Sequence, residues 1–200
     1  MTAPAPGSTD RAVRVATATD AAAVAAIYRS AVEDGHASFE AVAPGEDDMR
    51  NRMSAVLARY PWLVAESAND IDGYAYASPH RDRAAYRWSA DVTVYVAASR
   101  QGQGVGRALY SRLLPILEAQ GLHRAYAGIA LPNAGSVRLH EACGFVHIGV
   151  YEEVGFKHGA WRDVGWWGRP LAAAAHQPAE PIWFPDLPRV GVVAHVFRAD

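Results

Sequence analysis

A glycine-rich turn carries the clearest chemical signal in this sequence. Residues 100–107 read Arg-Gln-Gly-Gln-Gly-Val-Gly-Arg and stand between a strand pattern and a helix pattern. Closely spaced glycines let backbone N–H groups approach an anion without obstruction by a Cβ atom, and a helix N-terminus adds a partial positive charge. Arg100 and Arg107 add full positive charges. The turn therefore predicts a site for a phosphate-bearing ligand; the alternative is a glycine-rich helix cap that holds no ligand.

The spacing of the glycines disfavours two common phosphate-binding motifs. A dinucleotide-binding turn needs Gly-x-Gly-x-x-Gly or a final alanine, whereas counting from Gly102 or Gly104 puts Arg107 or Leu109 in the last slot. A P-loop needs Lys-Ser or Lys-Thr, and the turn contains neither pair. Both the NAD-type and the ATP-type interpretation therefore fail.

Hydrophobic periodicity predicts the elements that must position this turn. Residues 91–97 alternate strictly between valine and polar or aromatic side chains, which is typical of a half-buried strand. The other expected strands are 14–17, 62–66, 71–78, 125–130, 145–153 and 160–167; the expected helices are 21–33, 46–59, one from the glycine turn to about Gln120, and 134–143; residues 79–87 are expected to form a basic, aromatic loop. These elements show no internal repeat.

Local signals mark several of the boundaries. Asp20 is the expected N-cap of the first helix, Asn69-Asp70 is a turn signal between two strands, and Gly144 is the expected C-cap of the last helix. Pro115 should kink the long helix or loosen its end, because proline lacks the N–H that a helix interior requires. Residues 190–197 are a candidate late strand.

Composition favours a soluble globular protein. The 200 residues are half apolar and one fifth charged, which suits one domain. A single cysteine, Cys143, excludes an internal disulfide and a cysteine-rich zinc module, so no metal is expected. There is no run of 18 apolar residues, and Met1–Asp10 lacks the pattern of a signal peptide. The net charge of −2 argues against a nucleic-acid partner. We expect a cytoplasmic protein with no membrane contact.

Two blocks of residues carry a resemblance to a known family. Gln101-x-x-Gly104-x-Gly106 after a strand resembles the pyrophosphate loop of the GNAT acyl-CoA N-acyltransferases, and residues 133–145 are similar to their second block, Asn-x-x-Ala-x-x-Leu-Tyr-x-x-x-Gly-Phe. Six further segments resemble the phosphinothricin N-acetyltransferase branch: 60–66, 76–79, 85–88, 93–96, 118–121 and 157–165. The expected organisation is a flexible leader at 1–12, an acetyltransferase domain at 13–170 and a proline-rich irregular tail at 171–200.

The resemblance implies a fold, a reaction and a cofactor. The fold is α/β (α+β), with a mixed, mostly antiparallel central sheet that is flanked by helices and splayed at the cofactor-binding strands. The reaction moves an acetyl group from acetyl-CoA to the amine of a small amino-acid-like substrate, of the phosphinothricin, methionine sulfoximine or methionine sulfone type. The expected cofactor-binding residues are Val94, Tyr95, Val96, Gln101, Gly102, Gln103, Gly104, Val105, Gly106, Arg107, Asn133 and Ser136.

Three residues are the candidates for proton transfer. Asp91 enters the strand that leads to the cofactor and is the expected general base, where the resembled branch carries glutamate. Aspartate is one methylene shorter and would act through a water; the alternative is a strand-start residue that makes a turn bond. His140 and Tyr110 are the candidates for protonating the departing thiolate, because the His140 slot resembles the family's tyrosine. A helix-face histidine bonded to the backbone is the alternative for His140.

The acceptor amine needs cations for its acidic groups. Arg81 and Arg83 lie beside Tyr86 just before the Asp91 strand, and arginine binds such oxyanions in a bidentate manner. A solvated basic loop is the alternative. Phe39 and Tyr95 are the expected apolar walls of the substrate site, and the Lys157-His158 pair is a candidate to overhang it.

Aromatic residues near the end of the domain bear on the oligomeric state. Tyr126, Trp161, Trp166 and Trp167 are expected in the core or at an interface, and the resemblance implies a homodimer. The chain could instead be a non-catalytic CoA-binding or interaction module, or an N-acetyltransferase of an unrelated amine.

Overall fold

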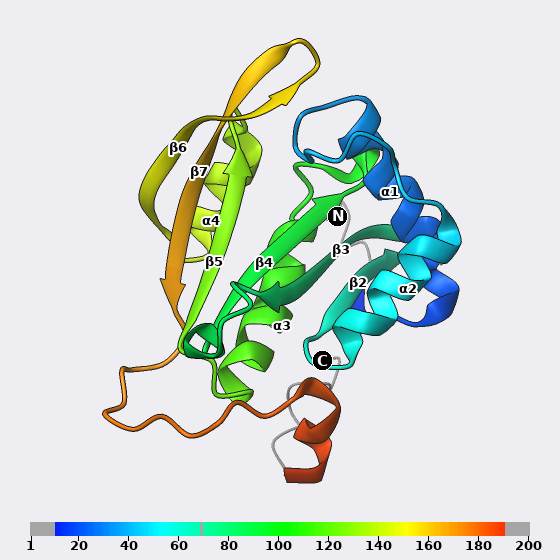
Figure 1. The fold of residues 1–200 in the computed structure, drawn as a ribbon. Helices are drawn as coiled ribbons and strands as arrows, with labels where there is room; N and C mark the ends of the chain where they lie inside the picture. The colour runs from blue at the N-terminus through cyan, green and yellow to red at the C-terminus, as the bar shows by residue number, and fades with distance from the viewer. Residues whose placement is uncertain (1–10, 69, 191–200) are drawn as a thin grey trace, which may run out of the picture.

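A seven-stranded sheet forms the centre of the protein (Figure 1), and the computed structural model describes residues 11–68 and 70–190. The strands are β1 (Ala12–Val15), β2 (Trp62–Ser67), β3 (Asp70–Pro79), β4 (Ser89–Val96), β5 (Arg124–Ala130), β6 (Val146–Lys157) and β7 (Ala160–Pro170), in the spatial order β1-β2-β3-β4-β5-β7-β6. All neighbouring pairs are antiparallel except β4 and β5, which are parallel. The expected mixed, mostly antiparallel sheet is confirmed.

Helices cover both faces of the sheet. They are α1 (Ala21–Glu33), α2 (Glu46–Leu57), α3 (Val105–Ala119) and α4 (Ala134–Ala142). Leu63 and Ala65 pack in one apolar cluster with the buried face of α3, whereas Trp62 and Val64 pack in a second cluster with α1 and α2. Because side chains alternate along a strand, β2 contributes to both cores. No helix among residues 11–68 and 70–190 is long and apolar enough to cross a membrane.

The sheet splits between β4 and β5. The two strands pair only from Ser89 to Asp91 on β4, opposite Arg124 to Tyr126 on β5. Beyond this point the strands diverge, as Figure 1 shows, while β4 remains paired with β3 and β5 with β7. In the described part of the chain, the later backbone groups of β4 therefore have no strand partner on the β5 side. The expected splay is confirmed, and its last paired residue on β4 is Asp91.

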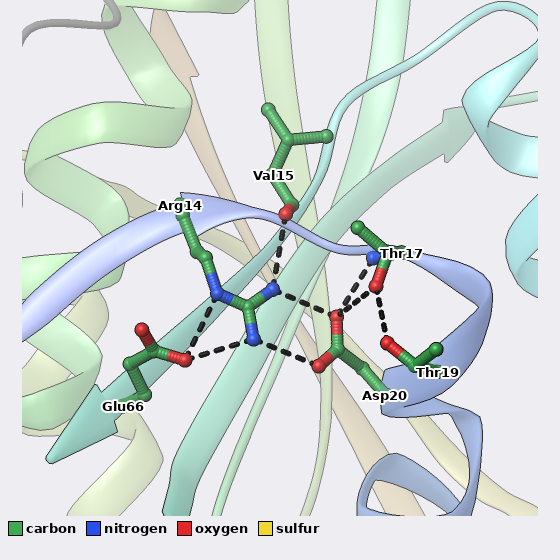
Figure 2. A network of polar contacts seen from close by, with 6 residues as sticks. All are labelled: Arg14, Val15, Thr17, Thr19, Asp20 and Glu66. Atoms are coloured by element: carbon green, nitrogen blue, oxygen red, sulfur yellow. Dashed lines mark hydrogen bonds and ion pairs between the residues drawn. The ribbon is translucent and has the colours of Figure 1, made fainter. Parts of the chain in front are cut away.

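A polar network ties β1 to the start of α1 (Figure 2). The Arg14 guanidinium donates to both carboxylate oxygens of Asp20 at 2.8 Å and to Glu66 of β2 at 2.9 Å. Asp20 accepts a further hydrogen bond from the Thr17 backbone N–H at 2.7 Å and so closes a capping box on the 3₁₀ helix Ala18–Asp20. Asp20 stands at the N-cap position of α1, but its carboxylate caps this preceding turn rather than α1 itself, because it is committed to Arg14 and Thr17.

Most predicted boundaries lie within a few residues of the observed ones, and the exceptions have physical reasons. β2 and β3 meet in a tight turn where the sequence predicts one, with Asp70 as the first residue of β3, paired with Ser67; Asn69 lies outside the described residues. The long helix continues through Pro115 to Ala119, because apolar side chains on both sides of the proline are buried in the core. Gly144 follows α4 with φ of +83°, as a C-cap requires.

The segment after β7 packs against the domain. It is irregular up to the 3₁₀ helix Phe184–Val190, yet Phe184 and Leu187 are buried in the same cluster as α3. The Gln120 side-chain amide donates to the carbonyl oxygens of Arg59 and Ile182 at 2.8 and 2.9 Å, which fastens the segment. The candidate strand at 190–197 is wrong at Val190, which ends the 3₁₀ helix, and its remaining residues lie outside the described part of the chain.

Candidate functional site

The splay of the sheet opens a cavity of about 710 Å³. Its walls come from the unpaired part of β4, the end of β5, the glycine-rich turn and the first turns of α3 and α4, with residues of α1 and its following loop on the remaining side. Of the predicted cofactor-binding residues, those that line it are Val94, Tyr95, Val96, Gln101, Gly102, Gly104, Val105, Gly106, Arg107, Asn133 and Ser136. Gln103 does not, because its side-chain amide donates to the Ser99 carbonyl at 2.9 Å.

The glycine-rich turn has the geometry of an anion cradle. Gly102 and Gly104 have φ of +72° and +80°, a region that other residues rarely adopt, and nothing lies within 4 Å of the place where a Cβ would stand. Gly104 is the N-cap of α3, so the first N–H groups of the helix point toward the same space. Gly106 has a packing role instead. A Cβ there would lie 2.6 Å from the Leu139 side chain, so the lack of a side chain at Gly106 lets α3 approach α4.

Buried ion pairs hold the base of this turn. Asp72 of β3 is only 1% exposed, and its carboxylate accepts from Arg100 at 3.0 Å, from Arg11 at 3.1 Å and from the Ser67 hydroxyl at 2.9 Å. Arg11 also donates to the Gln103 carbonyl at 3.1 Å. Arg100 lines the cavity, but its charge is partly neutralised by Asp72, so it anchors the turn as well as facing the ligand space.

The start of α4 completes the polar wall. Asn133 is the N-cap, and its side-chain oxygen accepts from the Ser136 N–H at 3.0 Å. Arg138, further along α4, lines the same cavity. Sequence reasoning overlooked Arg138; its place in the Asn133–Phe145 block, on the face of α4 that looks toward the glycine turn, is the signal that would have found it.

His140 and Tyr110 form a buried pair beside the cavity. The His140 Nδ1 lies 2.8 Å from the Ser136 carbonyl, which can only accept, so Nδ1 carries the proton and Nε2 accepts from the Tyr110 hydroxyl at 2.8 Å. Burial lowers the pKa of His140 and raises that of Tyr110, so both groups are neutral at pH 7. His140 lines the cavity and Tyr110 does not, so only His140 faces the ligand space directly.

Asp91 is paired with a histidine that sequence reasoning overlooked. The Asp91 Oδ1 lies 2.6 Å from His80 Nδ1, and burial raises the pKa of the Asp91 carboxyl while His80 and Arg81 oppose that rise. Neither partner lines the cavity, but Thr93, the next residue on the same face of β4, does. His80 and Asp91 belong to no local motif; only the pairing of β3 with β4 could have indicated their contact.

A second cavity of about 420 Å³ adjoins the first. Its residues include Phe39 and Glu40 of the loop between α1 and α2, Tyr28 of α1, and Val164 of β7. The two cavities share four lining residues: Ala37, Tyr95, Gly128 and Ala130. Of the residues predicted to contact the substrate, Phe39 lines the second cavity and Tyr95 lines both.

The structure separates the predicted basic loop from this second cavity. Arg81, Arg83 and Tyr86 are exposed and line neither cavity; Arg81 lies over the Trp166 ring, with its guanidinium carbon 5.7 Å from the ring centroid. Arg81 also acts on Asp91, which lies at the other end of β4 from Tyr95.

The hairpin of β6 and β7 secures the loop that carries Phe39. The Lys157 ammonium donates to the carbonyl oxygens of Ser38 and Glu40 at 2.6 and 2.9 Å, and His158 Nε2 donates to the Gly35 carbonyl at 3.0 Å. These contacts position the loop, and neither residue lines either cavity.

Comparisons with known proteins agree with this geometry. The family model described as "Acetyltransferase (GNAT) domain" matches residues 13–166. A phosphinothricin N-acetyltransferase of Streptomyces viridochromogenes is 41% identical over 171 residues, covering 85% of this chain and 93% of that protein. An L-methionine sulfoximine/L-methionine sulfone acetyltransferase of Salmonella typhimurium is 36% identical over 159 residues, covering 76% of this chain and 90% of that protein.

Solved structures give the same result. The structure of a GNAT superfamily phosphinothricin acetyltransferase from Sinorhizobium meliloti in complex with AcCoA has a TM-score of 0.82 and 34% identity, covering 94% of this chain and 99% of that one. The fold and the site thus define an acyl-CoA-dependent acyltransferase. The chain belongs to the GNAT acetyltransferase family, and its activity is that of a GNAT-type N-acetyltransferase with acetyl-CoA as acyl donor.

Proposed function

We propose that the enzyme acetylates the primary amine of small amino acids that carry a second polar head group, of the phosphinothricin or methionine sulfoximine type. The observation that carries this proposal is the contact between the two cavities at Tyr95 and Gly128, which lets a donor and an acceptor meet at the unpaired part of β4. The smaller cavity, of about 420 Å³, suits an amino-acid-sized acceptor. The named activities of the Streptomyces and Salmonella relatives support the same substrate class.

The residues of the larger cavity fit acetyl-CoA. The open, left-handed glycines of the turn and the N-terminus of α3 suit a pyrophosphate, with Arg107 and Arg138 as nearby cations. The unpaired backbone of β4 from Val94 to Val96 offers hydrogen-bonding groups to an amide-containing arm, which the sheet would otherwise use. The bound donor supplies an activated acetyl thioester.

Asp91 is the proposed general base. An amine attacks only when it is unprotonated, and base catalysis is typically worth about 10²–10⁴-fold in rate. Asp91 precedes the cavity residue Thr93 by two positions, or roughly 7 Å along a strand. A short carboxylate at that distance would act through one water.

His140 is the proposed proton source for the departing thiolate, with Tyr110 behind it. The Ser136 hydroxyl lies 3.3 Å from the His140 Nδ1 and lines the same cavity, so it can pass a proton from the imidazole to the thiolate. As Nδ1 gives up its proton, the Tyr110 hydroxyl passes its own proton to Nε2, so the imidazole stays neutral, and solvent returns a proton to the Tyr110 oxygen.

Phe39 and Tyr95 are proposed as walls of the acceptor pocket. Arg81 and Arg83, with Tyr86, are proposed to draw in the anionic groups of the substrate at the Asp91 end of β4. Both arginines lack an ion-pair partner among the described residues, so their charge is available to a ligand.

We propose further that the enzyme is a cytoplasmic homodimer joined at the β6 edge of the sheet. Large apolar side chains are exposed on β6, namely Val146, Ile148, Val150, Tyr151, Val154 and Phe156, and Trp161 of β7 is exposed opposite Phe156. Light scattering should give about twice the 21.5 kDa mass of one chain. Phe156→Glu should return the monomer mass, and Ala55→Glu, at an exposed alanine of α2 on the opposite side of the sheet from β6 (Figure 1), should not.

The test of the proposed function is release of free CoA from acetyl-CoA on a panel of amines. Phosphinothricin, methionine sulfoximine and methionine sulfone should be turned over with higher kcat/KM than ordinary amino acids. Tight CoA binding without turnover on any amine would favour a CoA-binding module, and preference for a chemically unrelated amine would replace the substrate class.

A further inference from the structure

Asp91 does not act alone in this geometry. We propose that His80 is a positioning residue for acetyl transfer, which fixes the Asp91 carboxylate in one orientation and keeps it in the state that accepts a proton. The inference rests on the proposed function, because it assumes that Asp91 is the base.

The pairing of β3 with β4 brings the two residues together. Ser78 lies opposite Asp91 and Pro79 opposite Ala90, so His80 is the first residue beyond the paired strand and lies beside the last rung before the splay. The distance from His80 Nδ1 to Asp91 Oδ1 is 2.6 Å, which suits a charge-assisted hydrogen bond. Since an ionised carboxylate only accepts, Nδ1 donates, and Nε2 has no hydrogen-bond partner within residues 11–68 and 70–190.

Three aromatic rings hold the imidazole in place. His80 stacks on Tyr126 of β5 with ring centroids 4.5 Å apart, and meets Tyr86 and Trp166 edge-on at 5.8 and 6.0 Å. The His80 side chain is 15% exposed and that of Asp91 is 25% exposed. A ring packed on three sides cannot turn away, so the carboxylate that it binds is held in one orientation as well.

The surroundings of Asp91 make such a partner necessary. Burial is the largest influence on its pKa and raises it, which favours the protonated form that cannot act as a base. The groups facing the pair are Arg81 from the same loop, Tyr60 and Tyr76 beside β2 and β3, and Tyr86, Tyr126 and Trp166 around the ring. Only His80 and Arg81 oppose the rise, and only His80 does so through a hydrogen bond.

Two substitutions separate the hydrogen bond from the packing. His80→Phe keeps an aromatic ring against Tyr126 and removes the donor, whereas His80→Asn keeps a donor near the position of Nδ1 and does not titrate. His176→Asn, at an exposed histidine in the segment after β7, controls for loss of a histidine elsewhere. Each variant is assayed for kcat and both KM values, and for kcat/KM of the acceptor from pH 5 to 9.

We expect His80→Phe to lower kcat about tenfold at pH 6 and to move the acid limb of the profile to higher pH. The sign follows because loss of the hydrogen bond raises the pKa of Asp91, so a higher pH is needed to ionise it. His80→Asn should stay within about threefold of wild type, His176→Asn should match it, and the KM for acetyl-CoA should not change in any variant.

Three results would overturn the proposal. The first is a His80→Phe pH profile that superposes on that of wild type. The second is an acid limb that moves to lower pH, which would make the imidazole itself the base, and the third is an equal loss of kcat in His80→Phe and His80→Asn. The Asp91 carboxyl is also titrated by ¹³C NMR in wild type and His80→Phe. The titration tests the role of His80 even if the enzyme turns over no amine. Absence of turnover would refute the proposed function, whereas an unchanged Asp91 titration would refute the role of His80.

Discussion

Gly104→Val should impair acetyl-CoA binding in an enzyme that still folds. The backbone of Gly104 has φ of +80°, where a side chain costs about 1–2 kcal/mol. A Cβ there would meet no protein atom within 4 Å, so the space that the valine enters is the space left for the ligand. We expect the KM for acetyl-CoA to rise at least tenfold, which corresponds to about 1.4 kcal/mol, in a steady-state assay at saturating amine.

Gly121 provides a matched control for this experiment. It has φ of +79°, nothing lies within 4 Å of its Cβ position, and it lies at the other end of α3 outside both cavities. Gly121→Val should therefore lower the free energy of unfolding by a similar amount and leave the KM unchanged. An unchanged KM in a folded Gly104→Val enzyme, or an equal rise in Gly121→Val, would refute the assignment of the turn.

Three further variants test the substrate clamp, the glycine turn and the Arg14–Asp20 ion pair. Replacing Arg81 and Arg83 with alanine should raise the KM of the amine several-fold and spare that of acetyl-CoA; parallel changes in the two constants would argue against a substrate clamp. Asp72→Asn should raise the KM for acetyl-CoA and not that of the amine, because it loosens the base of the glycine turn; an unchanged value would contradict this. Asp20→Asn should lower the free energy of unfolding by about 1–3 kcal/mol at pH 7 in urea. Arg14 lowers the pKa of Asp20, so the ionised carboxylate stabilises the fold above the unfolded pKa of about 4 and the deficit should shrink as the pH falls below it; a deficit independent of pH would exclude the ion pair.

The sequence predicts elements well where one period dominates. The alternating residues 91–97 and the apolar stripe after the glycine turn correspond to β4 and α3 within two residues, apart from the fate of Pro115. The pyrophosphate-type turn was recognisable because glycine spacing and the following helix lie within one stretch of chain. The second block, from Asn133 to Phe145, was recognisable for the same reason.

Features that depend on distant contacts were not predictable in this way. The contact of His80 with Asp91 needs the register of β3 on β4, and the ion pair of Arg100 needs a buried Asp72 from another hairpin. The segment after β7 has no period, so the burial of its apolar residues, Leu187 among them, could not be inferred from proline-rich composition. Pairing and packing, rather than local preference, decide these positions.

The central claim is that a carboxylate at Asp91 serves as the base for acetyl transfer to an amine. The most direct test is the pH dependence of kcat for Asp91→Asn and Asp91→Glu with methionine sulfone or phosphinothricin as acceptor. Asn keeps the size and removes the charge, so kcat should fall about 10²-fold and the acid limb should flatten, whereas Glu should retain activity. An Asp91→Asn enzyme that keeps both the wild-type rate and the wild-type acid limb would contradict the account and make Asp91 a structural residue.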